Sequence, residues 1–234
     1  MKKIIFSIIL MLSFGFNANA EKGINAGVTL LYGAFDVTGA EEKLAANHSS
    51  GAGSAATVKH SAEGENAEGE FGLASIFVEK TLGDKFAIGI DYVPMAADSE
   101  TAENKTNVAG SRTAGTGVDG ALTNTVQVEF ENLTTAYAMI NLGPVYVKAG
   151  VMTVDVNTKE NLGTGGAYGN TSLDGTMLAL GMDRELDNGA FVRLEGTVME
   201  FDGVELTNQN DSTKSVKVDG IDGYGARISI GKSF

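Results

Sequence analysis

The residues best suited to acid–base or metal chemistry in this chain are two histidines, His48 and His60. Both lie within residues 38–69, which are rich in Ala, Gly, Ser, Asn and Glu and contain no aromatic residue. Such a stretch buries little apolar surface, whereas catalytic side chains need rigid supports. The spacing of the histidines matches no standard zinc site, and the chain has no cysteine. The sequence therefore predicts no catalytic residue, no metal site and no cofactor, and indicates a protein that is not an enzyme.

Charged residues at alternating positions form a second candidate set. In stretches such as Val192-Arg193-Leu194, a charge stands between two apolar neighbours. Successive side chains of an extended strand point to opposite faces, so these charges would share one face while the apolar residues share the other. The set consists of Asp91, Glu129, Lys148, Asp183, Arg193, Glu195 and Arg227. We expect these residues to form a charge network inside a closed sheet.

The elements that must position this network are long alternating segments. Eight of them are found, at residues 24–36, 70–82, 85–93, 125–142, 145–156, 173–186, 190–201 and 224–234. Each has at least nine residues, and a tilted membrane strand needs ~9–11, whereas strands of soluble proteins more often have ~5–6. In the segment 70–82 the parity stays open, because Phe71, Leu73 and Phe77 compete with Ile76, Val78 and Leu82 for the lipid face.

The connections between these segments alternate in length. Three are tight and carry Gly, Asp, Asn or Pro, at residues 82–85, 141–144 and 186–189. Four are long, at about residues 37–69, 94–124, 157–172 and 202–221. This alternation predicts an all-β, eight-stranded antiparallel up-and-down transmembrane barrel with short periplasmic turns and long extracellular loops. The loops at 38–69 and 95–124 have no aromatic residue, and we expect them to be mobile.

The two ends of the chain carry export signals. Lys2 and Lys3, the apolar run 4–16 and the small residues Ala18 and Ala20 predict a cleaved secretory signal peptide at residues 1–20, which leaves 21–234 as the barrel domain. The last segment ends in an aromatic residue and has apolar residues at every second position, apart from Lys232. It is similar to the C-terminal signal by which bacterial outer-membrane proteins are recognised for insertion, here formed by Tyr224, Ile228, Ile230 and Phe234.

Composition narrows the class further. The formal net charge is −13, which argues against nucleic-acid binding. Beyond the signal peptide no apolar stretch is long enough for a membrane helix, whereas the alternating strands of a membrane barrel keep hydropathy low. The chain has 31 glycines, as a tightly coiled small barrel allows, and only two prolines. It has no tryptophan, so any aromatic girdle must consist of Tyr and Phe.

Taken together, the signal peptide, strands, turns and terminal Phe234 resemble the small eight-stranded bacterial outer-membrane barrels, namely the OmpA transmembrane domain, OmpX/Ail and the opacity-type proteins. Residues 82–92 look like the turn and strand typical of this group. The resemblance implies an outer-membrane location, contact with outer-membrane lipid and lipopolysaccharide, recognition by the assembly machinery through the C-terminal strand, and a monomer. It names no extracellular ligand.

The resemblance implies a non-enzymatic protein that acts in envelope structure or surface interaction through its extracellular loops. Two alternatives stay open. One is a narrow porin-like channel, since an excess of carboxylates in the lumen would favour cations. The other is a secreted soluble β adhesin or carrier, in which apolar residues would face inward and charges outward. For the membrane barrel we predict that Leu180→Arg blocks assembly and that Gly181→Ser, on the inner face, does not.

Overall fold

The structure, a computed structural model, describes residues 23–44, 59–61, 65–99, 102–107, 121–162, 167–210, 212 and 214–234. The predicted signal peptide and His48 lie outside these residues. Among the described residues, no helix has the length and apolarity needed to cross a membrane.

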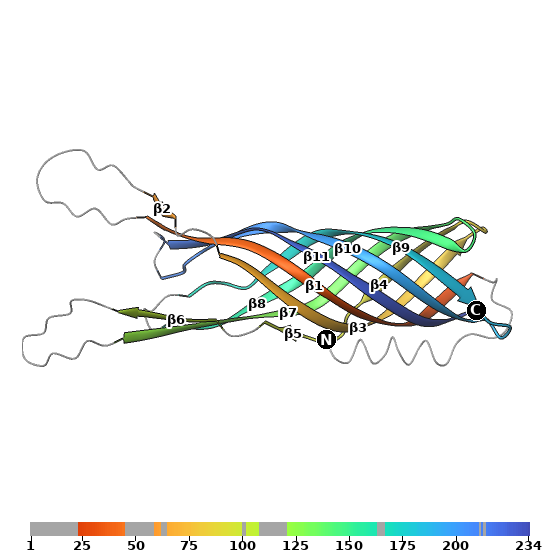
Figure 1. Cartoon of the computed structure of the whole chain (residues 1–234), viewed down its shortest axis with the longest axis horizontal. Helices are drawn as coiled ribbons and strands as arrows, with labels where there is room; N and C mark the ends of the chain where they lie inside the picture. The colour runs from red at the N-terminus through yellow and green to blue at the C-terminus, as the bar shows by residue number, and fades with distance from the viewer. Residues whose placement is uncertain are drawn as a thin grey trace, which may run out of the picture.

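All the regular elements in the described residues are strands, and most of them form one closed sheet (Figure 1). Neighbouring strands are antiparallel in the order β11-β10-β9-β8-β7-β4-β3-β1, and β11 pairs back with β1 to close a barrel of eight strands. The short strands β2, β5 and β6 add to its rim. The bounds are β1 (Ile24–Leu44), β2 (Lys59–Ser61), β3 (Glu65–Leu82), β4 (Phe86–Tyr92), β5 (Ala97–Asp98), β6 (Ala102–Asn107), β7 (Ala121–Asn141), β8 (Val145–Leu162), β9 (Thr171–Glu185), β10 (Ala190–Thr207) and β11 (Lys214–Ser233).

Three tight turns lie together at one end of the barrel, as predicted (Figure 1). Gly83, Gly143 and Gly189 occupy these turns with φ of 67°, 96° and 78°, a conformation that glycine adopts without steric cost. The C-terminus lies at the same end, where the backbone N–H of Phe234 donates to the carbonyl of Ile24 at 2.8 Å. We call this the turn end of the barrel and the opposite end the loop end.

Toward the loop end the strands run well past their predicted bounds. Parts of the segments expected as loops are paired strand instead, including residues 37–44, 65–69, 121–124, 157–162, 202–207 and 214–221. The β10–β11 ladder, for example, continues through Val204 opposite Val218 to Thr207 opposite Ser215. An antiparallel ladder satisfies backbone groups in water as well as in lipid, so hairpins need not end at the membrane surface.

Most aromatic rings that point into the barrel lie against glycines. In seven directly opposed pairs an added Cβ on the glycine would come closer than 3.0 Å to the ring. Because glycine has no side chain, each ring can lie flat against the inner wall of the barrel. The rings therefore do not collide with one another in the narrow interior. The pairs are Phe35–Gly69, Phe71–Gly33, Phe77–Gly27, Tyr137–Gly89, Tyr146–Gly181, Phe191–Gly231 and Phe201–Gly175.

A β-bulge interrupts β7 between Glu131 and Thr134. Asn132 sits there at φ 58°, a left-handed conformation that Asn tolerates better than most residues. Its side chain is held on both sides, since Oδ1 accepts from the Tyr92 hydroxyl at 2.9 Å and Nδ2 donates to Asp155 Oδ2 at 2.9 Å. The extra residue reverses the direction of every side chain of β7 on the loop side of the bulge.

Candidate functional site

The charge network inside the barrel includes a residue outside the predicted set, Glu79 on β3, which is buried in the turn-end half. Arg193 from β10 donates to it through both terminal nitrogens, with Nη1 2.8 Å from Oε2 and Nη2 2.6 Å from Oε1. Asn25 Nδ2 donates to Oε1 at 2.7 Å, and the Tyr137 hydroxyl donates to Oε2 at 3.0 Å. A bidentate pair with two further donors is among the strongest arrangements available to a buried carboxylate.

Two more ion pairs complete the network. Lys148 Nζ lies 2.6 Å from Glu195 Oε1, and Arg227 Nη2 lies 2.6 Å from Asp91 Oδ2. Arg227 Nε is also 3.8 Å from Glu195 Oε2, which links the two pairs. Among the described residues of the turn-end half, three buried carboxylates thus meet three buried cations, so acid is not in excess there. This balance differs from the acid-rich lumen expected from the sequence.

Aromatic rings fill the space around these cations. The guanidinium of Arg193 lies 4.5 Å from the centre of the Phe191 ring and 5.7 Å from that of Phe77. Lys148 Nζ lies 4.6 Å from the centre of the Tyr137 ring. Such contacts favour cations that have left water. These rings and ion pairs are all buried inside the turn-end half.

The predicted charge set is placed unevenly. The structure brings Asp91, Lys148, Arg193, Glu195 and Arg227 together inside the barrel. Asp183 lies opposite Arg193 on β9 but is exposed at the turn end.

The prediction for Glu129 is wrong. The bulge at Asn132 turns it to the outer surface, where it lies 2.5 Å from Lys159 Nζ. Lys159 also lies 3.1 Å from Asp98, and the hydrogen bond to Glu129, followed by the one to Asp98, raises the pKa of Lys159 above its ordinary value.

The sequence did not identify Glu79, although this buried residue accepts hydrogen bonds from Arg193, Asn25 and Tyr137. The strand that carries it has apolar residues on both faces, so the parity stayed open. The structure resolves that ambiguity: Ser75, Phe77 and Glu79 point inward, whereas Val78 and Leu82 are exposed on the outer surface. Two polar residues, Ser75 and Glu79, stand four positions apart and so on one face of a strand, which is a sequence signal that favours this parity.

The turn-end half has an apolar outer surface. Exposed side chains from every barrel strand form an apolar belt there, among them Leu30, Val78, Ile88, Ile140, Val151, Leu180, Leu194 and Ile228. Tyr32 and Tyr224 lie at the border of the belt that faces the loop end. Asp36 and Asp222 follow on the same strands, further toward the loop end. Amphipathic tyrosines between apolar and acidic residues are typical of the lipid–water interface. Tyr224, Ile228 and Ile230 of the predicted assembly signal all belong to this belt.

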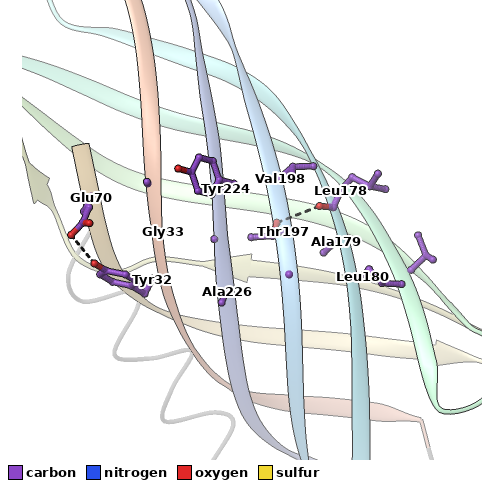
Figure 2. A pocket seen from close by; sticks show the side chains of 14 residues that line it. Tyr32, Gly33, Glu70, Leu178, Ala179, Leu180, Thr197, Val198, Tyr224 and Ala226 are labelled. Atoms are coloured by element: carbon purple, nitrogen blue, oxygen red, sulfur yellow. Dashed lines mark hydrogen bonds between the residues drawn. The ribbon is translucent and has the colours of Figure 1, made fainter. Parts of the chain in front are cut away.

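A hollow interrupts the belt over β9, β10, β11 and β1, as Figure 2 shows. The hollow forms because the small residues Gly196 and Ala226 lie opposite each other, between the larger Leu180 and Tyr32. At one side the Tyr32 hydroxyl donates to Glu70 Oε2 at 2.6 Å. The lining is otherwise nearly all apolar, so the acyl chains of the bilayer can fill the hollow without leaving a polar group unpaired.

The loop-end half is built the opposite way. Its interior is apolar, with Val154, Val156 and Leu173 buried against partners that include Val128, Phe130, Phe201, Val204 and Ile221. The exposed side chains at this level include the carboxylates Glu70, Asp174, Glu200, Asp202 and Asp222. Inside this half lies a cavity of about 140 Å³ between Phe35, Phe71, Leu133, Leu173, Met199 and Phe201.

The inward position of Gly181 does not make it a tolerant site. A Cβ there would lie 2.5 Å from the Tyr146 ring and 2.8 Å from Glu195 Cγ, both within the charge network. The structure therefore argues against the expectation that Gly181→Ser is harmless.

The barrel resembles solved outer-membrane proteins in its fold. OmpT, an outer membrane protease from Escherichia coli, has a TM-score of 0.42 at 9% identity and covers 95% of this chain and 100% of its own. OprG from Pseudomonas aeruginosa has a TM-score of 0.43 at 14% identity, with 93% and 99% covered. Ail from Yersinia pestis has a TM-score of 0.33 at 10% identity, with 88% and 99% covered. No family model and no curated protein sequence matches the chain.

An apolar belt outside and paired charges inside a closed strand barrel are the pattern required to cross a bilayer without an unsatisfied polar group. The protein is an outer-membrane β-barrel. The identities and TM-scores above transfer no role to it, and the neighbours differ among themselves, since OmpT is a protease.

Proposed function

We propose that this outer-membrane barrel is a non-enzymatic surface protein that projects a stiff β-extension from the bilayer and presents its hairpin tips for surface interaction. The observation that supports this is strand length. β1 and β7 have 21 residues each, and β8 and β10 have 18. A strand of that length spans roughly 60–70 Å, while a tilted strand needs only ~9–11 residues to cross the membrane. About half of each long strand therefore stands outside.

The closed interior of the turn-end half also supports this role over a channel. An eight-stranded barrel is only just wide enough for its own side chains, and here the interior holds three ion pairs and the rings around them. The pairs balance in charge, so they offer no acidic ring to attract a cation. Among the described residues no group of acidic residues or histidines could hold a metal ion.

The partners follow from the surfaces. Lipid and lipopolysaccharide would contact the apolar belt and its tyrosine border. The assembly machinery would recognise the C-terminal strand, with Phe234 at its end, and a closed barrel needs no second copy. These partners are part of the proposal. The extracellular ligand has no chemical signature in the described residues.

The test shortens one hairpin without disturbing the membrane barrel. Residues 205–217 are replaced by Asn-Gly, a two-residue turn that would join Val204 and Val218, which already oppose each other. The control replaces Asp187 and Asn188, in a turn at the other end, with Asn and Gly. Both variants should keep the shifted gel mobility of unboiled protein. Only the shortened hairpin should reduce attachment of expressing cells to animal cells or extracellular-matrix protein. Equal attachment, or stepwise conductance of the wild type in planar bilayers, would overturn the proposal, and conductance would favour a channel.

A further inference from the structure

We propose that the cavity in the loop-end half binds a small uncharged apolar molecule, of about the size of benzene. This inference is independent of the proposed surface role. It starts from the cavity volume of about 140 Å³ and from a lining made almost entirely of apolar side chains. The polar residues Glu70, Asp98 and Ser99 make up only a small part of the lining. A water molecule needs two to four polar partners, whereas apolar cavities near this size in other proteins take up benzene or xenon.

The cavity is a consequence of how the aromatic residues pack. Phe35, Phe71 and Phe201 each lie opposite a glycine, at Gly69, Gly33 and Gly175 respectively. An added Cβ on any of these glycines would collide with the ring it faces. The rings of Phe35 and Phe71 also stack on each other, with centroids 6.3 Å apart and an interplanar angle of 27°. Flat rings line the wall and leave the centre open.

The floor of the cavity separates it from the ion pairs. Leu31, Met152, Met177 and Met199 form one buried cluster with Tyr137, whose hydroxyl donates to Glu79. The ring of Tyr137 thus faces the apolar half and its hydroxyl faces the charged half. A ligand on this floor meets methionine and leucine side chains, and methionine adapts readily to irregular apolar shapes.

The charges near the cavity select against an ion. Glu70 accepts the Tyr32 hydroxyl, and Asp98 lies 3.1 Å from Lys159 Nζ. Both carboxylates are therefore already engaged at the edge of the cavity. An anion would meet no cation in the lining, and a cation would leave water for a mostly apolar space whose two carboxylates are already held by Tyr32 and Lys159. The lining therefore favours a neutral occupant.

One side of the cavity is closed by side chains instead of backbone pairing. β4 pairs with β3 only from Ile76 to Leu82, although β3 begins at Glu65. From Ser75 toward the loop end, the wall consists of Phe71 and Leu73 on one side and Val93 and Met95 on the other. A small molecule could enter here by displacing flexible side chains such as Met95, which is 43% exposed, with no strand hydrogen bond broken.

Methyl groups of methionine report on each compartment separately. Met199 lines the cavity, Met182 is exposed in the lipid belt, and Met139 is buried beside Ala87 and Tyr146 in the turn-end half. The experiment is a benzene titration of protein labelled with ¹³C at the methionine methyl groups, in lipid nanodiscs, followed by methyl NMR. We expect a saturable shift at Met199, no shift at Met139, and at Met182 at most a linear drift from benzene in the bilayer.

Two substitutions on one strand provide the matched comparison. Leu173→Phe places a larger side chain in the cavity, whereas Leu178→Phe makes the same change on the lipid face of β9. The saturable shift at Met199 should be lost in the first variant and kept in the second. If Leu173→Phe fails to fold, Val154→Phe fills the same cavity from β8. A linear drift at Met199, or a saturable shift that survives a folded cavity-filling variant, would overturn the proposal.

Discussion

The two halves of this barrel solve opposite solvation problems with the same strands. In the turn-end half, Glu79, Arg193 and their partners are buried inside and Leu180 and its neighbours are exposed outside. In the loop-end half, Leu173 and Phe201 face inward and Glu200 faces outward. The first arrangement suits lipid and the second suits water. The β-barrel itself therefore specifies neither solvent, and the inside–outside assignment is made separately at each level of the strands.

The largest loss of stability should come from removing one partner of a buried ion pair in the turn-end half. Glu79→Leu leaves the buried guanidinium of Arg193 without its bidentate partner, and removing one member of a buried pair costs about 3–5 kcal/mol. The urea concentration that unfolds the barrel in lipid vesicles should fall sharply, as followed by gel mobility. Adding Arg193→Met should recover most of the loss. A single variant as stable as the wild type would mean that the pair is not buried as described.

The effect of an added cation on the outer surface should depend on its position along the barrel axis. Leu180→Arg places a cation in the lipid belt, at a cost of about 2–4 kcal/mol near the bilayer midplane. Glu200→Arg introduces the same cation on the outer face of β10 on the loop-end side of the belt, where water solvates it. The amount of each variant in the outer-membrane fraction should be strongly reduced for the first and normal for the second. Equal amounts of the two variants would contradict the conclusion that lipid surrounds the turn-end half and water surrounds the loop-end half.

A smaller effect is expected at the bulge. Asn132→Val places a β-branched residue at φ 58° and removes the hydrogen bonds to Tyr92 and Asp155, at a cost of about 1–3 kcal/mol. Asn132→Gly keeps the backbone conformation at no steric cost and loses only the hydrogen bonds. The urea midpoint should therefore fall more for Val than for Gly. The reverse order would show that the side-chain contacts, and not the backbone conformation, fix the bulge.

The smallest effect belongs to the exposed ion pairs of the loop-end half. Because the folded-state pKa of Lys159 is raised, its interaction with Glu129 and Asp98 stabilises the barrel below the ordinary lysine value of 10.5. That contribution is lost as the pH rises through the raised folded-state pKa. The difference in urea midpoint between the wild type and Lys159→Met should be small, should shrink in high salt, and should vanish at strongly alkaline pH. A difference that persists there would have another origin.

Much of the fold could be predicted from the sequence, because strand alternation and turn residues are local. The eight strands, the three turns and the inward position of Arg193 and Glu195 all follow from period-two patterns. Glu129 was misplaced because a single extra residue at Asn132 reverses parity, and that insertion has no signature in an alternating pattern. Glu79 was missed because its strand is apolar on both faces.

The change from a charged interior in the turn-end half to an apolar interior in the loop-end half is partly visible in the sequence. On β10 the inward residues change from Arg193, Glu195 and Thr197 to Met199 and Phe201, with no change of parity. Parity alone cannot say which solvent surrounds a strand, so a strand pattern by itself is compatible with both a membrane barrel and a soluble one. The cavity could not be predicted, since it depends on how rings from separate strands lie against glycines.

The unpaired stretch of β3 also limits how deeply the barrel can sit in a membrane. In the part of the chain that the structure describes, β3 above Ser75 has a ladder partner only on its β1 side. Each backbone group left without a partner in hydrocarbon costs several kcal/mol, while in water it costs little. In a bilayer thicker than the apolar belt, the barrel therefore cannot sink further to match it. Hydrophobic mismatch would instead be met by local thinning of the lipid next to β3 and β4, which would make this flank a site where thin membrane is favoured.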